Sequence, residues 1–488
     1  MTEPLELATI VARFAPPDVG KAMALQLAIR RAVHQSVLRP EDELPSTRRA
    51  AEALEISRNT VLEAYEGLNA EGVIETRRGA RPVICALPDC TTPASQGASA
   101  IPRSSRGRIA GDDHRQGYVI GESRALAPGL PDPDLFPRDD WATSLRRAAR
   151  LSRNGNDMYD AYEGLPELRD ALARYLKRYR GANVDPAQVF IVPSTQSALA
   201  LLADLFADPG DTALMEDPCY AGGRAAFEAR GLVVRPLEDP VATGRAGAPP
   251  RLLYVTPSTQ YPTGTRMKLK RRMELLAFAR AHRALILEDD YDGDFVWRGI
   301  NVPPFLSLDD AGHVVMIGTA SKSLLPALRL AWVIVPMSLV EPVRRAHRAL
   351  GYAVNVQVQA AFADFIRSGQ FARHLRAAAR VYRDRMACMT AAIRTRLGPG
   401  VGVSSPDGGL QILVRLQDGA DDRAIAEQMW RAGFQVLPLS RLCIESVQRG
   451  IVVGFACANA ERADQFAKTL STLLAEGQPR EADVGVAP

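Results

Sequence analysis

A lysine, an aspartate and a tyrosine stand at the expected ends of two apolar runs in the second half of the chain. Lys322 lies in GTASKSLLPALRL, close behind the run VVMI, and Arg329 follows seven residues later. A lone lysine there could simply extend its amine to solvent. However, Asp289 and Tyr291 end another apolar run about thirty residues upstream. Open α/β sheets bind ligands at the carboxyl ends of their strands, so we expect these side chains to meet there.

Two further runs end in residues suited to the same ligand. Ser194, Thr195 and Gln196 stand at a strand-to-helix turn, where backbone N–H groups and the helix dipole bind phosphate. Tyr220 follows another run, and its ring can stack on a heterocycle. A lysine amine can form a Schiff base with an aldehyde, and a carboxylate can keep a pyridinium nitrogen protonated. Together these demands describe pyridoxal 5'-phosphate.

The elements that must position these residues alternate along the chain. Seven strand-like runs are separated by helical stretches: VFIVPS, TALMEDP, GLVVRPL, RLLYVTPS, ALILEDDYD, HVVMIGTAS and LRLAWVIVP. Continuous apolar strands between amphipathic helices predict an α/β fold with a mostly parallel sheet covered on both faces. A long helical stretch over 358–397 and a smaller α+β segment ending in GIVVGFACA follow.

The first 88 residues have a different pattern. Three helical segments are expected, with Leu25 and Ile29 on the apolar stripe of the first and serine caps before the other two, followed by a hairpin turning at Gly79. Three helices and a hairpin predict a winged helix-turn-helix. The third helix of such a domain begins at Ser57 and would enter the major groove of double-stranded DNA.

Arginines coincide with the expected DNA contact points of this segment. Arg58, Asn59 and Thr60 would face base edges, since Arg suits guanine and Asn suits adenine. Arg48 and the wing arginine Arg78 would mainly contact phosphate. The alternative is a solvated face of a small helical domain, because acidic residues slightly outnumber basic ones over 1–88.

Composition limits the remaining possibilities. A chain of 488 residues predicts two or three domains, and a net charge of +4 means that DNA binding would depend on a local patch. The six cysteines show no metal-ligand spacing, and neither a signal peptide nor a membrane helix is expected, so we expect a cytoplasmic protein without a metal site. A Ser/Gly/Pro-rich stretch predicts a linker, whose arginines either touch a polyanion or are merely solvated. The expected domains are 1–88, a linker 89–123, a ligand-binding domain 124–475 and a tail 476–488.

Both parts resemble known families. The stretch LPSTRRAAEALEISRNTVLEAYEGLNAEGVIETRRG resembles the GntR-type winged helix-turn-helix, over most of residues 21–84. The motifs PGLPDPDLFP, EDPCY, TPSTQYPTG, EDDYDGDF, GTASKSLLPALRL and VVGFA are similar, in order and spacing, to fold type I pyridoxal-phosphate aminotransferases.

The aminotransferase resemblance implies a role for each matching residue. Lys322 would form the internal aldimine, and Asp289 would pair with the pyridine nitrogen. Tyr291 would bond the ring hydroxyl, and Tyr220 would stack on the ring. The phosphate would be held by Ser194, Thr195, Ser321 and Arg329.

A GntR-type domain joined to an aminotransferase-like body resembles the MocR/GabR-like transcriptional regulators over nearly the whole chain. This resemblance implies a head-to-tail, domain-swapped homodimer that binds operator DNA and senses an amine, an amino acid or the cofactor itself. The alternative is an active aminotransferase with an accessory DNA-binding domain, and the sequence leaves enzymatic turnover undecided.

The sequence departs from these families at positions that bear on the effector. Val452 stands where transaminases usually have a carboxylate-binding arginine. Arg441 is either its replacement or a surface arginine. Ser194 stands where a glycine is common, and Thr259 and Gln411 stand where the regulators often have histidine.

Overall fold

The computed structural model describes residues 4–77, 80–86, 104, 106, 126–151, 162–237, 249–296, 303–398 and 401–476. The chain divides into two compact units, Met1–Pro102 and Arg103–Pro488, which we call the head and the body and describe separately. Nearly all of the expected linker and tail lies outside the described residues, so the domain boundaries remain predictions. Among the described residues, no helix combines the length and hydropathy that a membrane span requires.

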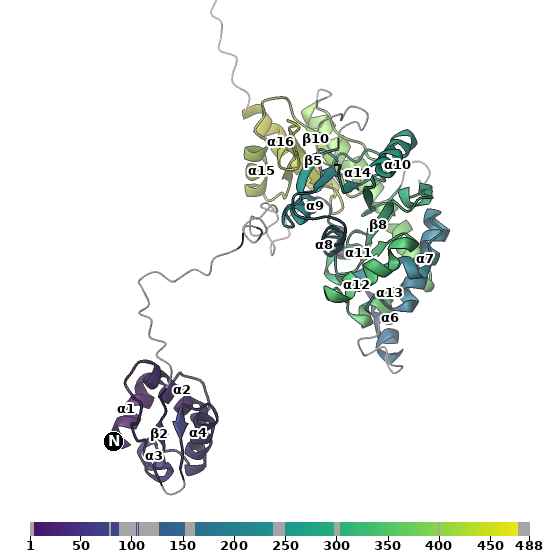
Figure 1. Cartoon of the computed structure of the whole chain (residues 1–488). Helices are drawn as coiled ribbons and strands as arrows, with labels where there is room; N and C mark the ends of the chain where they lie inside the picture. The colour runs from purple at the N-terminus through teal and green to yellow at the C-terminus, as the bar shows by residue number, and fades with distance from the viewer. Residues whose placement is uncertain are drawn as a thin grey trace, which may run out of the picture. The chain divides into compact units, whose positions relative to one another are not determined.

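The described residues of the head form four helices and a short hairpin (Figure 1). They are α1 (Pro4–Phe14), α2 (Lys21–His34), α3 (Thr47–Leu54) and α4 (Arg58–Ala70), followed by β1 (Ile74–Glu75) and β2 (Val83–Ile84), which pair antiparallel. The three expected helices are confirmed as α2 to α4, and α1 was not predicted. Its buried residues Leu7, Ile10 and Phe14 follow helical spacing, so a signal for this helix was present in the sequence.

Serine caps and one buried tyrosine fix the helix-turn-helix. Ser46 accepts a hydrogen bond from the backbone N–H of Arg49, and Ser57 accepts one from that of Thr60 at 3.1 Å. These bonds satisfy backbone donors that the first turn of a helix leaves open. The buried Tyr65 hydroxyl donates to the carbonyl of Pro45 at 3.0 Å, which ties α4 to the turn before α3.

The body is built on a seven-stranded sheet in the order β3-β9-β8-β7-β6-β4-β5. All seven expected runs form strands: β3 (Val189–Val192), β4 (Thr212–Met215), β5 (Val233–Pro236), β6 (Leu252–Val255), β7 (Leu285–Asp289), β8 (Val314–Thr319) and β9 (Ala331–Ile334). Strand β9 is antiparallel to both of its neighbours, and the other strands run in one direction. The predicted mostly parallel sheet is therefore confirmed.

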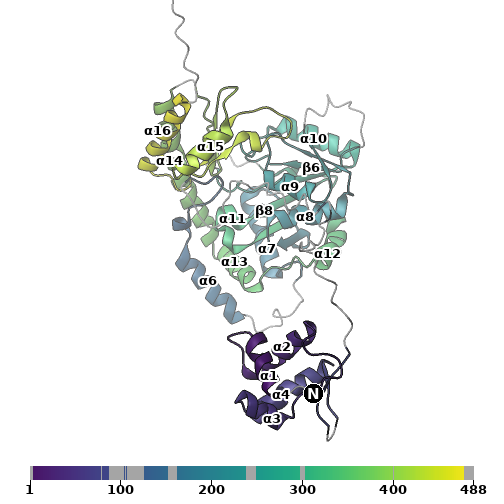
Figure 2. The same cartoon turned by 90° about the vertical axis from the view of Figure 1, so that its left-hand side faces the viewer.

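Helices cover both faces of this sheet (Figure 2). On one face, Phe190 and Val192 of β3 pack in a core with α8 (Thr195–Phe206), α9 (Ala221–Glu228) and α12 (Val340–Ala349). The opposite face packs against α7 (Pro166–Tyr175), α10 (Leu269–His282) and α13 (Val356–Arg367). Helix α6 (Arg138–Leu151) packs against α13. Because both faces are covered, most strands contain buried residues without alternation.

A smaller α+β part completes the body. The long stretch expected to be helical breaks at Gly369, whose φ is 76°, into α13 and α14 (Gln370–Leu397). Strands β10 (Gln411–Arg415), β11 (Leu437–Pro438) and β12 (Gly450–Gly454) form an antiparallel sheet in the order β10-β12-β11. Helices α15 (Asp422–Arg431) and α16 (Ala460–Glu476) pack with it, and α16 lies along α14 (Figure 2).

Candidate functional site

The parallel strands of the body bring the predicted cofactor residues to one edge of the sheet. Ser194, Asp289 and the helix that carries Lys322 all directly follow or end strands that run in the same direction: β3, β7 and β8. Tyr220 follows β4, which is parallel to β6 and through it to β7. The carboxyl edge of the sheet therefore holds the residues that the sequence predicted to meet there.

Lys322 lies on the short helix α11 (Ala320–Ser323), directly after β8. The Thr319 side chain caps this helix by accepting a hydrogen bond from the N–H of Ser321 at 3.1 Å. The Lys322 amine points inward and donates to the carbonyl of Gly129 at 2.7 Å. Burial lowers the pKa of Lys322, against the opposing charges of Asp289 and Asp292. A lysine held in this way is a better nucleophile than one in water, because more of it is neutral.

Asp289 offers one carboxylate oxygen that the described residues leave unused. The Tyr254 hydroxyl donates to Oδ2 at 2.7 Å, while the buried Oδ1 has no hydrogen-bond partner among the described residues. Burial raises the pKa of Asp289 to about 7. A buried acceptor without a partner is costly, and a protonated pyridine nitrogen would supply the missing donor. This oxygen fits the predicted cofactor.

Three tyrosines form an aromatic group at the same edge. Tyr220 receives a hydrogen bond on its hydroxyl from Gln196 Nε2 at 2.9 Å, and its ring lies edge to face with Tyr261. Tyr261 in turn lies edge to face with Tyr291. Gly222 makes room for Tyr220, because a Cβ there would lie 2.5 Å from the ring atom Cζ. The Tyr291 hydroxyl donates to the carbonyl of Thr259 at 3.0 Å, so its predicted bond to a ring hydroxyl remains a prediction.

The predicted phosphate residues stand at two helix starts and one turn. Ser194 caps α8 by accepting a hydrogen bond from the N–H of Ser197 at 3.1 Å, and Thr195 is the first residue of that helix. Ser321 lies in the first turn of α11. Arg329 follows the 3-10 turn η6 (Pro326–Leu328), is exposed and has φ of 49°. Helix starts bind anions, but a shared phosphate site for these four residues remains a prediction.

The expected carboxylate-binding position lies in an apolar cluster. Val452 on β12 is fully buried with leucines of the small sheet and packs beside Tyr220, Tyr261 and Tyr291. Arg441 ends the 3-10 turn η8 (Leu439–Arg441) and is exposed. Its proposed role as a carboxylate ligand remains untested.

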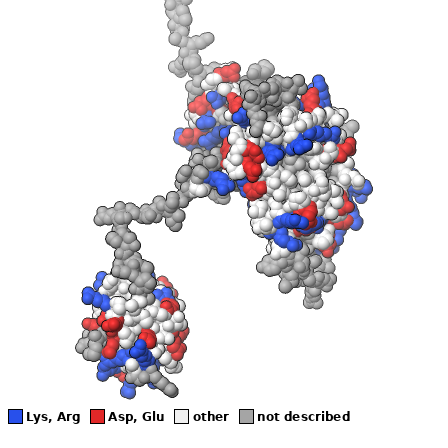
Figure 3. Space-filling view, viewed as in Figure 1, with Lys and Arg blue, Asp and Glu red and all other residues white. Residues whose placement is uncertain are grey.

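The predicted DNA-contacting residues of the head lie on one continuous motif. Arg48, Ser57, Arg58 and Asn59 are exposed, and Thr60 is half-buried at the start of α4. Arg58 Nε is 3.4 Å from the Thr47 hydroxyl, which connects the starts of α3 and α4. On the face shown in Figure 3, basic side chains gather at the end of the head that carries α3 in Figure 1. Arg78 lies outside the described residues, so its wing contact stays a prediction.

Comparisons with known proteins agree with both parts. Residues 22–84 match the family described as bacterial regulatory proteins, gntR family, and residues 131–470 match aminotransferase class I and II. A probable rhizopine catabolism regulatory protein, MocR of Rhizobium meliloti, is 37% identical over 90% of this chain and 90% of its own length. The chain belongs to the MocR-type transcriptional regulators. It combines a GntR-type DNA-binding head with an aminotransferase-like body.

Further relatives of this MocR-type regulator cover the same two parts or the body alone. An uncharacterized HTH-type transcriptional regulator, YhdI of Bacillus subtilis, is 33% identical over 86% of this chain and 88% of its own length. The crystal structure of an archaeal alanine:glyoxylate aminotransferase is 27% identical, with a TM-score of 0.69, over 77% of this chain and 98% of its own. The aminotransferase class I fold implies pyridoxal-phosphate binding, consistent with the open acceptor on Asp289.

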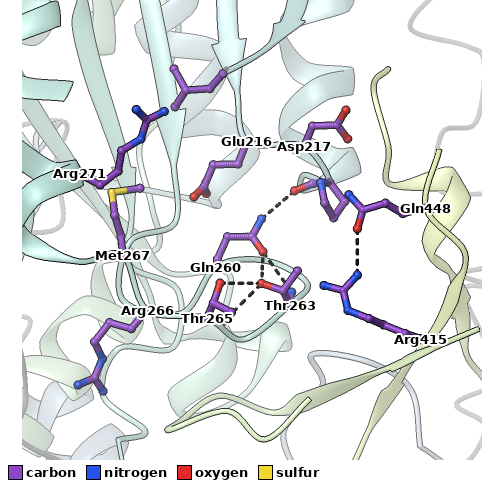
Figure 4. A pocket seen from close by; sticks show the side chains of 12 residues that line it. Glu216, Asp217, Gln260, Thr263, Thr265, Arg266, Met267, Arg271, Arg415 and Gln448 are labelled. Carbon is purple, nitrogen blue, oxygen red and sulfur yellow. Dashed lines mark hydrogen bonds between the residues drawn. The ribbon is translucent and has the colours of Figure 1, made fainter. Parts of the chain in front are cut away.

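The loop after β6 brings Thr259 and Tyr261 to the site. Hydrogen bonds of Gln260, which lies between them, stabilise this loop. Gln260 donates to the carbonyl of Pro218, and its Oε1 accepts from Thr263 (Figure 4). Gln260 also donates to the carbonyl of Tyr261. A cavity of about 380 Å³ lies beside this loop. It is lined by Glu216, Asp217, Pro218, Leu237, Gln260, Thr263, Thr265, Arg266, Met267, Arg271, Arg415 and Gln448. These bonds hold the loop that positions Thr259 and Tyr261.

Sequence reasoning missed three residues that act on Lys322 or Asp289. Tyr254 was assigned only to a strand, and its contact with Asp289 spans 35 residues. Gly129 lies 193 residues before Lys322, so no local pattern connects the two. Asp292 stands in the same EDDYDGDF motif as Asp289 but was given no role. Asp292 follows the carboxylate-rich end of β7, and this cluster of acidic residues was the signal in the sequence that could have indicated a role.

Proposed function

We propose that this regulator holds pyridoxal phosphate covalently through the Lys322 amine and uses it to sense an amine, an amino acid or the cofactor itself. The observation that carries the proposal is the buried, unpartnered Oδ1 of Asp289 at the same sheet edge as the inward-pointing lysine. A buried carboxylate is expected to have a partner, and the cofactor ring nitrogen is a suitable one.

The residues of this edge would each perform a distinct task. Bound pyridoxal phosphate supplies an aldehyde that condenses reversibly with primary amines. Asp289 holds a proton on the ring nitrogen, and Tyr254 orients that carboxylate by its 2.7 Å hydrogen bond. Tyr220 stacks on the ring with its hydroxyl fixed by Gln196. The starts of α8 and α11, with Arg329, hold the phosphate.

The head would recognise operator DNA by the start of α4. Arg58 and Asn59 reach base edges in the major groove, while Arg48 and Arg78 contact phosphate. Two copies would associate head to tail with exchanged heads, as the resemblance to this regulator family implies. An effector that binds one arrangement of this dimer better than another would then shift the population of DNA-binding heads.

Active transamination is the second candidate function, favoured by the match of residues 131–470 to aminotransferases. A turnover assay separates the two candidates. The purified chain is loaded with pyridoxal phosphate and given an amino donor and a keto-acid acceptor. If the chain senses without turnover, the amino donor should yield at most one equivalent of its own keto acid per chain. Sustained keto-acid production would contradict it.

The covalent attachment is tested by the visible spectrum. The wild-type chain mixed with pyridoxal phosphate should acquire an absorption band that survives gel filtration and shifts on adding a suitable amine. A wild-type chain that acquires no such band would overturn the proposal.

A further inference from the structure

The long helix α14 has an exposed face that is rich in arginine. Its 28 residues include seven arginines and a single aspartate. Four exposed arginines recur at intervals of three and four residues: Arg373, Arg376, Arg380 and Arg383. This spacing places them on one side of the helix, over a length of about 15 Å. We call this set the arginine stripe.

The opposite side of α14 fixes the helix in the body. Leu375 and Tyr382 are buried in the hydrophobic core. His374 Nε2 donates to the carbonyl of Ser323 at 2.8 Å, directly after Lys322. The arginine stripe therefore lies on the outer side of a helix whose inner side is held in place and contacts the lysine helix α11.

Most of the arginine stripe is not neutralised by ion pairs. Arg373, Arg376 and Arg380 form neither a side-chain hydrogen bond nor an ion pair with any described residue. Arg383 pairs with Asp384 at 3.1 Å, and at least half of each of these two side chains is exposed. The stripe thus presents an excess of positive charge to solvent.

Other helices of the body pair their exposed arginines with acids one turn away. On α12, Arg344 and Arg345 pair with Glu341 at 2.6 and 2.9 Å. On α15, Arg431 pairs with Glu427 at 2.5 Å. An excess of unpaired arginine is therefore a particular feature of α14 when it is compared with these two helices.

The arginine stripe opposes the local stability of α14. Arg373 and Arg376 are three residues apart, and Arg376 and Arg380 are four apart, so like charges are neighbours along the helix. Arg373 also lies in the first turn, which contains no acidic residue, although the helix dipole favours anions there. A bound polyanion would offset both effects.

We propose that the arginine stripe is a second DNA-contacting surface, which binds backbone phosphates of double-stranded DNA next to the site held by the head. The chain belongs to a family of DNA-binding regulators, so duplex DNA is a polyanion that it meets. Over about 15 Å, duplex DNA carries about nine phosphates. Contacts to phosphates add affinity without reading the base sequence. This inference does not depend on pyridoxal phosphate.

The test compares two DNA fragments with the full-length chain. The shorter fragment ends at the edges of the site that the chain selects from a random pool, and the longer one adds two helical turns on each side. At about 0.1 M salt the wild type should bind the longer fragment at least fivefold more tightly. The triple variant Arg373→Gln, Arg376→Gln, Arg380→Gln should lose this gain and keep its affinity for the shorter fragment.

The salt dependence provides a second readout. Each lost phosphate contact lowers the slope of log affinity against log salt by about 0.9, so the slope on the longer fragment should fall by about 2–3 in the triple variant. Lysines at the same three positions should restore the gain, because a phosphate accepts any point charge. The glutamine variant should unfold at a temperature no lower than the wild type, because it removes repulsion.

Three exposed charges at the ends of α10 serve as the matched control: Lys268→Gln, Lys270→Gln, Arg283→Gln. Helix α10 lies apart from α14 in Figure 2, so this variant should match the wild type on both fragments. A wild-type preference for the longer fragment in the stripe variant, or an equal loss in the control, would overturn the inference. A wild type that binds neither fragment would contradict DNA recognition by the head, and with it this inference.

Discussion

One ion pair in the head and one in the body show two opposite environments for charge. In the head, Arg48 pairs with Glu52 at 3.3 Å while their side chains remain 84% and 67% exposed. In the body, Arg180 pairs with Asp290 at 2.5 Å, and both side chains are 2% exposed. Exposed pairs contribute little to stability and are easily exchanged for phosphate. Buried charges must find partners inside the fold, because their hydration is lost.

This difference explains why different structural features identify the two candidate sites. A DNA-contacting arginine on the head needs only to be exposed on a fixed helix start. In the body, Arg180 satisfies Asp290, whereas Asp289 Oδ1 has no hydrogen-bond partner among the described residues. In a buried site, an unsatisfied acceptor is the feature that points to a ligand.

The largest expected effect comes from a substitution that should remove cofactor attachment in the body and leave DNA binding by the head. Lys322→Ala should abolish the absorption band that survives gel filtration, because no amine remains for covalent attachment. DNA binding by the head should persist, as the change lies outside the head. Absorbance after gel filtration and a DNA mobility-shift assay measure the two results. A surviving band would show that another amine holds the cofactor.

The next effect concerns the head. Arg58→Ala should weaken binding to the preferred DNA by about 1–3 kcal/mol, with loss of discrimination at one base position. Its cofactor spectrum should equal that of the wild type. Lys21→Ala, which removes another exposed charge from the head, serves as the control. An unchanged affinity of Arg58→Ala would remove this residue from the interface.

A smaller effect concerns the pH dependence of the body. The pKa of Asp289 is raised from 3.8 to about 7, so the folded chain binds this proton more tightly than the unfolded chain. The contribution of Asp289 to the unfolding free energy is therefore full below about pH 4 and is lost as the pH rises through 7. Asp289→Asn should flatten the stability profile between these values and weaken cofactor binding at least tenfold.

Chemical denaturation of the cofactor-free protein at several pH values measures the change in slope. Glu288, whose pKa is also raised to about 7, keeps part of the slope in the variant. An identical profile in Asp289→Asn and the wild type would contradict the assignment.

The smallest effect tests the cap of the recognition helix. Ser57→Ala removes the acceptor of the 3.1 Å bond from the N–H of Thr60 and should cost about 1 kcal/mol in head stability. The thermal transition of the body should not move. Matched substitution of the exposed Ser36 should change neither transition. A shift of the body transition would mean that the two parts unfold together.

The sequence predicted those features that depend on local pattern. Seven bounded apolar runs predicted the strands. Residues at or just after the ends of these runs, such as Asp289 and Lys322, lie at one edge of the sheet because parallel strands share a direction. Contacts between distant segments could not be predicted. Gly129 accepts from Lys322 across 193 residues. The unpartnered Oδ1 of Asp289 could be recognised only in the structure, where every neighbouring described donor has a position.

The central claim is that cofactor chemistry in the body controls DNA binding by the head. Its direct test is the affinity of the loaded full-length chain for a DNA fragment that this chain selects from a random pool, with and without an amine that shifts its visible band. The account predicts at least a fivefold change in the wild type, the low end of typical coupling between sites, and no change in Lys322→Ala. Equal affinities with and without the amine in the wild type would contradict it.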